Sequence, residues 1–153
     1  MSLINKFLRI SLCIVLISIV SACSEPERNE LRFALASMPS NLDPRFSTDA
    51  SSSRIGRLLF QKLVDFNQAK QPVPAIASWD RINDTLYRFT LNDKVSKFHN
   101  GLILTSKDVK ATYDFILNKD NSSPHRASLS LIKNITTPDS NTIEFELSKI
   151  DPL

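Results

Sequence analysis

The chain has few of the residues on which several common kinds of functional site depend. Its 153 residues include only two glycines, two cysteines and two histidines. Gly56 and Gly101 stand too far apart to form a glycine-rich phosphate-binding loop. No Gly-x-Ser-x-Gly segment is present, and only His99 and His125 could serve as imidazole bases. We therefore predict that the chain has no catalytic residues and is not an enzyme.

Metal-ligating residues are equally scarce. The two histidines form no His-x-x-x-His pair, and Cys13 and Cys23 both lie near the N-terminus. No metal site and no cofactor are expected. His99 precedes Asn100 and Gly101 in a segment that is typical of a turn, so we interpret this histidine as structural.

The N-terminus has the organisation of an export signal. Lys6 and Arg9 precede the apolar run ISLCIVLISIV, which is too short to cross a bilayer comfortably. The following Val-Ser-Ala-Cys23 resembles the bacterial lipobox, whose cysteine is acylated and becomes the first residue of the mature chain. We predict a signal peptide over 1–22, a polar tether over 23–30 and a lipid anchor on Cys23. An ordinary secretory signal with a chance cysteine is the alternative.

The excess of basic residues does not indicate a nucleic-acid partner. Residues 1–22 contain two cations and no acid, and subtracting them from the formal charge of +3 leaves about +1. No basic face with interleaved aromatic residues is apparent, so binding of nucleic acid is not expected.

Hydrophobic periodicity predicts a mixture of helices and strands after the tether. Alternation predicts strands over 31–37 and 85–91, the second with one buried aromatic face. Helical spacing predicts a helix over 54–64 that Ser52 or Ser53 caps, and Thr105 with Asp108 forms a capping box before a second helix. That second helix would turn Val109, Tyr113, Phe115 or Ile116, and Leu117 toward a core. LIKNITT and NTIEFELS read as two strands joined by a turn at 138–141. The predicted fold class is therefore α/β, in the sense of mixed α+β.

The order of several short segments resembles one family. They are LRFA (31–34), NLDP (41–44), TDASSSR (48–54), LVD (63–65), VPAIASW (73–79), YRFTL (87–91), KFHNG (97–101), TSKDV (105–109), SPH (123–125) and TIEFEL (142–147). Together they resemble the family 5 extracellular solute-binding proteins of ABC importers, the peptide- and nickel-binding group. The resemblance runs from about residue 31 to the last residue. Asn100 stands where the family has Asp, and both side chains suit a turn.

This resemblance implies a two-lobed binding protein with an additional lobe in its peptide-binding members. Residues 31–60 would then begin ligand-binding lobe I, and 61–153 would cover much of the additional α/β lobe. The expected function is capture of oligopeptides, or of another small solute, for delivery to an ABC transporter permease. The protein would act outside the cell membrane, in the periplasm or on the outer face of the membrane, anchored through Cys23.

The resemblance also carries over a small set of ligand-binding residues. The polar segment after the Asp-Pro turn lies against the peptide backbone in peptide-binding relatives, and it maps onto Thr48, Asp49 and Ala50. Main-chain pairing there would bind peptides with little sequence preference. The alternative is that residues 48–51 merely lead into a helix. The residue after Ser-Pro is often an aromatic near the ligand, and His125 occupies that position.

Members of this family are longer than this chain, and the second ligand-binding lobe is not in it. We therefore expect a partial sequence, a truncated gene or one piece of a split gene. Three interpretations remain open: a peptide-binding subunit, a non-binding lipoprotein domain with a structural or interaction role, and a binder of nickel or oligosaccharide instead of peptide.

Overall fold

The computed structural model describes residues 30, 32–92 and 97–151. The predicted signal peptide and Cys23 lie outside the described residues. The described residues from Leu35 onward belong to one compact unit, which holds all the helices and strands discussed below. None of the helices in this part of the chain has the length and apolar character needed to cross a membrane.

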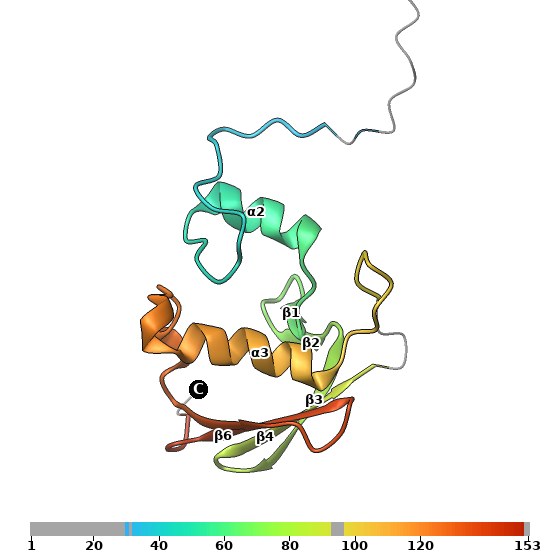
Figure 1. Ribbon diagram of the computed structural model, residues 1–153, viewed down its shortest axis with the longest axis vertical. Helices are drawn as coiled ribbons and strands as arrows, with labels where there is room; N and C mark the ends of the chain where they lie inside the picture. Colours follow the sequence, from blue (N-terminus) through green and yellow to red (C-terminus); the bar gives the residue numbers. More distant parts are fainter. Residues whose placement is uncertain (1–29, 31, 93–96, 152–153) are drawn as a thin grey trace, which may run out of the picture. The chain divides into compact units, whose positions relative to one another are not determined.

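A four-stranded antiparallel sheet is the main element of this unit (Figure 1). Its order is β3 (Ala77–Asn83), β4 (Leu86–Leu91), β6 (Thr142–Leu147) and β5 (Ile132–Thr136). The predicted strand over 85–91 is confirmed as β4, and the two predicted C-terminal strands are β5 and β6. Asp139 accepts hydrogen bonds from the N–H groups of Asn141 (2.7 Å) and Thr142 (2.8 Å), which closes the turn between these two strands.

Helix α3 (Ser106–Leu117) lies on one face of the sheet (Figure 1). The predicted capping box is confirmed, because the Asp108 carboxylate accepts from the Thr105 N–H and hydroxyl, both at 2.8 Å. The N–H of Ser106 donates to the Ser140 carbonyl (2.8 Å), and its hydroxyl donates to the Asp139 carbonyl. These bonds attach the start of the helix to the β5–β6 turn and thereby fix α3 above the sheet.

The hydrophobic core lies between α3 and the sheet. Val109 on the helix packs with five buried residues of the strands: Ala77, Leu91, Ile135, Ile143 and Phe145. The Phe145 ring meets Phe89 and Tyr113 edge to face, at centroid distances of 5.3 and 4.9 Å. Burial raises the pKa of Tyr113. Successive residues of β4 and β6 point to opposite faces of the sheet, and on the face away from the core Arg88 pairs with Glu144 at 2.6 Å.

Helix α2 (Ala50–Leu59) differs from the helix predicted over 54–64. It starts four residues earlier because Asp49, not Ser52 or Ser53, is the N-cap and accepts from the Ser52 N–H. It ends at Phe60, whose backbone is extended, and Leu63 leads into a strand instead. The apolar spacing through Leu63 therefore misled the prediction of the C-terminal end.

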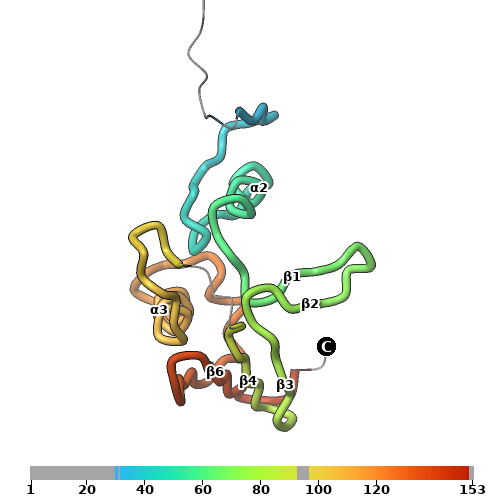
Figure 2. The backbone as a smooth tube through the Cα atoms, turned by 90° about the vertical axis from the view of Figure 1, so that its right-hand side faces the viewer, coloured from blue at the N-terminus to red at the C-terminus, as the bar shows by residue number. Residues whose placement is uncertain are grey.

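A second, two-stranded sheet follows α2. Strands β1 (Val64–Phe66) and β2 (Pro72–Pro74) pair antiparallel, and the hairpin projects on the opposite side from α3 in Figure 2. Strand β2 begins and ends with a proline, Pro72 and Pro74. Proline is compatible with an edge strand, because its missing N–H can face away from the partner.

The strand predicted over 31–37 is wrong for the part that is described. Residues 32–37 contain no regular structure. An extended segment becomes a strand only when it pairs with another, and within the described ranges no partner strand lies beside it. The alternation of Phe33 and Leu35 was therefore not sufficient.

Candidate functional site

The loop before α2 is organised around Asp43. Its carbonyl accepts from the N–H groups of Phe46 and Ser47, both at 3.0 Å. Its carboxylate accepts from the Arg45 main-chain N–H (2.9 Å) and pairs with the guanidinium, with the Nη2–Oδ2 distance at 2.6 Å. The side-chain hydrogen bond with Arg45 holds the pKa of Asp43 below its usual value. The loop is thus a folded turn, closed within five residues.

Two side chains of this loop contact Phe115 of α3. The guanidinium carbon of Arg45 lies 3.9 Å from the centroid of the Phe115 ring, and the Phe46 ring meets the same ring edge to face at 5.8 Å. Sequence analysis assigned Phe115 or Ile116 to the core of the unit. Ile116 is buried, whereas Phe115 contacts the loop.

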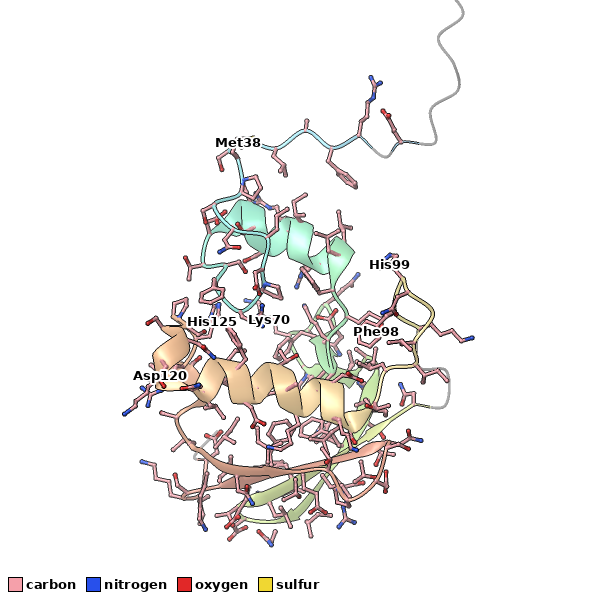
Figure 3. All side chains as sticks on the ribbon, viewed as in Figure 1. Met38, Lys70, Phe98, His99, Asp120 and His125 are labelled. Carbon is pink, nitrogen blue, oxygen red and sulfur yellow. The ribbon has the colours of Figure 1, made fainter. Side chains whose placement is uncertain are left out.

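Two carbonyl groups of the loop form hydrogen bonds with residues that follow α3. The Ser123 hydroxyl donates to the Arg45 carbonyl at 2.7 Å, and Nε2 of His125 lies 2.9 Å from the Ser47 carbonyl oxygen. A carbonyl only accepts hydrogen bonds, so Nε2 of His125 is the nitrogen that carries the proton. Figure 3 shows His125 among the turns that follow α3, at the 3-10 segments Lys119–Asn121 and Ala127–Leu129.

The predicted ligand segment, Thr48 to Ala50, forms the start of α2. The Asp49 carboxylate accepts from the Ser52 N–H (2.9 Å) and from the hydroxyls of Ser40 and Ser52, both at 2.5 Å. The hydrogen bonds from Ser40 and Ser52 lower the pKa of Asp49 well below its usual range. The Asp49 side chain therefore has its hydrogen-bonding partners inside the chain, and its role in the structure is to cap the helix.

The main chain beside Asp49 is more open. Thr48 is exposed, and no hydrogen bond joins its N–H or carbonyl to any residue that the structure describes. Ala50 is also exposed and is the first residue of α2, where the N–H has no partner within the helix. The backbone at Asp49 is extended, with φ −91° and ψ 161°. The groups that Thr48 and Ala50 expose to solvent are therefore main-chain groups and not charged side chains.

The structure brings together the two stretches that sequence analysis singled out. Thr48 follows Ser47 directly, and His125 contacts Ser47. Sequence analysis missed the contribution of Arg45, Phe46 and Phe115, since nothing in their spacing indicates that they meet. Ser123 was inside the SPH segment but had no assigned role.

The remaining sequence predictions concern metal ions and the turn at His99. Among the described residues, no group of three or more His, Cys, Asp or Glu side chains could hold a metal ion. His99 is exposed in a turn that Lys97 and Ile103 bracket as a bridge, and Figure 3 shows it at the tip of that turn. Gly101 has φ +84°, and Asn100 accepts from the Leu102 N–H at 3.1 Å. The predicted turn is therefore confirmed.

A cavity of about 470 Å³ lies between α3 and β5, and residues 43–50 are not part of its lining. Its cations include Lys110 and Lys133, which are paired with Asp114 (2.8 Å) and Glu146 (2.6 Å). Their charges are balanced locally, and the cavity supplies no residues to the Thr48–Ala50 segment.

Comparison with known proteins gives the family. Residues 71–153 match the bacterial extracellular solute-binding proteins, family 5, middle region. Over 141 residues the chain is 26% identical to the periplasmic murein peptide-binding protein MppA of Escherichia coli K12. The aligned region covers 80% of this chain and 26% of MppA.

Solved structures agree with this result. The unliganded open form of MppA matches with a TM-score of 0.68 and 26% identity, over 74% of this chain and 25% of MppA. AgaA from A. tumefaciens R10, in complex with agropinic acid, matches with a TM-score of 0.69 and 30% identity, over 75% of this chain and 23% of AgaA. The chain thus spans about a quarter of the length of these relatives.

The chain belongs to the family 5 bacterial extracellular solute-binding proteins. Its mixed α/β structure corresponds to part of the two-lobed fold of periplasmic binding proteins, as predicted. The family consists of extracellular solute-binding transport proteins and not of enzymes, and the relative MppA is a periplasmic protein.

Proposed function

We propose that this chain is part of a solute-binding subunit that captures oligopeptides and delivers them to the permease of an ABC importer. The observation that carries the proposal is the exposed main chain of Thr48 before α2, which has no hydrogen-bond partner among the described residues, in a family of solute-binding proteins. The names of two relatives agree with a peptide: MppA is a murein peptide-binding protein, and OppAIV of Borrelia burgdorferi is an oligopeptide-binding protein (26% identity, TM-score 0.67).

The chemistry of the segment suits a peptide. An extended peptide presents alternating N–H and carbonyl groups, and it pairs with exposed main-chain groups of a receptor as an added strand does. Thr48 offers both a donor and an acceptor, and Ala50 offers a donor. Because Asp49 is already hydrogen-bonded within the chain, recognition here would depend on the ligand's backbone and not on its side chains.

A small solute that is not a peptide is the second candidate. AgaA, the relative with 30% identity, was solved with agropinic acid. A carboxylate or hydroxyl group of such a molecule could also bond to the N–H groups of Thr48 and Ala50. The two candidates differ in the number of main-chain groups that the ligand can pair.

The proposed organisation assigns residues 31–60 to ligand-binding lobe I and 61–153 to the additional lobe. Export would use the signal peptide over 1–22, and acylation of Cys23 would anchor the protein in the cell envelope. Replacing Cys23 with Ser should release the protein from membranes into the soluble envelope fraction. Retention of the Ser variant on the membrane would contradict the anchor.

The binding experiment is calorimetry of the full-length protein with three ligands. Tri-alanine, agropinic acid and Ni²⁺ are titrated in parallel, each against the same ligand-free preparation. The proposal predicts saturable binding of tri-alanine. If only agropinic acid or only Ni²⁺ binds, that ligand and not a peptide represents the solute class. Binding of none of the three would favour a non-binding lipoprotein domain.

A further inference from the structure

The contacts between the loop before α2 and the segment after α3 follow a regular pattern. Ser123 bonds to the carbonyl of Arg45, and His125 bonds to the carbonyl of Ser47, so two residues spaced by two hold two carbonyls with the same spacing. Between them, Phe46 packs on Phe115. Every residue from Arg45 to Ser47 therefore has a contact with this part of the unit.

The bond from His125 has a direct effect on Thr48. The carbonyl of Ser47 and the N–H of Thr48 belong to the same planar peptide unit, and in a trans peptide they point in opposite directions. Fixing the Ser47 carbonyl against the imidazole therefore aims the Thr48 N–H away from His125. Because no other bond of the Thr48 main chain is found in the described residues, this orientation depends on the carbonyl side of the peptide.

We propose that Ser123 and His125 are positioning residues for solute binding, which orient the Thr48 N–H toward a carbonyl group of the bound ligand. The inference rests on the proposed function. It gives His125 an indirect role, through the Ser47 carbonyl, in place of the direct ligand contact that the family resemblance implies. Nε2 of His125 already donates to Ser47, and the side chain is half-buried. Ser123 is buried at 7% exposure, and its hydroxyl donates to Arg45, so it has little surface to offer a ligand.

Two substitutions at His125 separate positioning from packing. His125→Phe keeps a ring of similar size but removes the donor, so the Ser47 carbonyl loses its partner. His125→Gln keeps an N–H donor at the end of a side chain of comparable reach. If the donor is what matters, Gln should restore what Phe loses. Ser123→Ala tests the second carbonyl in the same way.

The first measurement needs no ligand. The amide ¹H and ¹⁵N shifts of Thr48 and Asp49 are compared in the wild-type protein and in the three variants. The proposal predicts that these amides shift in His125→Phe and return toward the wild-type position in His125→Gln, while amides of β4 and β6 stay unchanged. Unchanged Thr48 and Asp49 amides in His125→Phe would overturn the proposal.

The second measurement uses tri-alanine and two analogues in which one or the other peptide bond is replaced by an ester. An ester carbonyl is a weaker acceptor, so the wild-type protein should bind one analogue about three- to tenfold more weakly. The ratio of the affinity for tri-alanine to the affinity for that analogue should fall toward one in His125→Phe. In His125→Gln the ratio should keep its wild-type value. A purely structural role of His125 would weaken all three ligands equally and leave the ratio unchanged, which would contradict the proposal.

The two measurements fail separately. If the wild-type protein binds none of these ligands, the proposed peptide function is wrong, and the amide shifts alone decide whether His125 orients the Thr48 peptide. If tri-alanine binds and the ratio does not respond to His125→Phe, the function stands and the positioning role is wrong.

Discussion

The guanidinium of Arg45 lies against the face of the Phe115 ring, with the central carbon 3.9 Å from the ring centroid. The same guanidinium pairs with Asp43, two residues earlier in the chain. One aromatic residue of α3 therefore contacts both a cation and, through Phe46, a second aromatic ring of the loop before α2. Phe115 therefore links α3 to this loop through two contacts.

Replacing Phe115 with Ala should loosen the loop more than the core. Phe115 is half-buried, so we expect a loss of about 1–2 kcal/mol of unfolding free energy, below the full cost of a buried aromatic. Hydrogen exchange should accelerate at residues 46–53 and change little in β4 and β6. Phe66→Ala is the matched control, because Phe66 is 64% exposed and stacks on no other aromatic ring among the described residues. Equal destabilisation by the two variants would contradict this role of Phe115.

The core itself should respond differently. Ile143 is fully buried between α3 and the sheet, and Ile143→Ala should cost about 2–5 kcal/mol in chemical denaturation. Ile82→Ala removes the same atoms from a side chain that is 45% exposed and should cost well under half as much. Similar losses at both positions would mean that the sheet face carrying Ile143 is not the core.

The elements that sequence reasoning predicted well share one physical feature. β4, β6 and α3 each bury one face in the same core, so their alternation or helical spacing is visible in the sequence. The capping box of Thr105 and Asp108 is equally local. Family resemblance supplied what spacing alone could not, namely the fold of which this sheet and helix are a part.

The predictions that failed have two causes: the Asp49 cap of α2 is a local alternative to Ser52 and Ser53, whereas the other failures depended on contacts between distant residues. Residues 32–37 alternate but have no partner strand among the described residues, and α2 starts at a cap that sequence reasoning placed three or four residues too late. The attachment of Ser47 to His125 and of Arg45 to Ser123 joins residues that are far apart in the chain. No local pattern encodes such pairs. The sequence therefore suggested candidate site residues but not the contacts that bring them together.

The two glycines should have opposite responses to the same substitution. Gly101 has φ +84°, a conformation that disfavours any side chain, so Gly101→Ala should destabilise the protein by about 1 kcal/mol. Gly56 lies within α2 with open space around its Cβ position, and Gly56→Ala should stabilise α2 by roughly 0.5–1 kcal/mol. Thermal unfolding of the pair tests both turn and helix. Stabilisation by Gly101→Ala would contradict the turn geometry.

Acid should destabilise the start of α2 through Asp49. The pKa of this carboxyl is lowered by hydrogen bonds from Ser40 and Ser52, so its stabilisation is complete above the unfolded pKa of about 4 and is lost as the pH falls below it. Asp49→Asn keeps a good N-cap but does not titrate. The unfolding midpoint of the wild-type protein, relative to Asp49→Asn, should therefore fall as the pH drops from about 4. A difference independent of pH would exclude this carboxylate as the source.

The most direct test of the account is the affinity of Ala50→Pro for tri-alanine. Ala50 is the first residue of α2, where proline is well tolerated, and Asp49 before it is already extended. The substitution therefore removes one exposed N–H and leaves the helix in place, while Ala50→Val adds comparable bulk and keeps the N–H. If main-chain groups at the start of α2 bind the ligand, Ala50→Pro should lose about tenfold or more in affinity with an unchanged unfolding midpoint, and Ala50→Val should not. Equal affinities of the two variants and the wild-type protein would mean that residues 48–50 only lead into the helix.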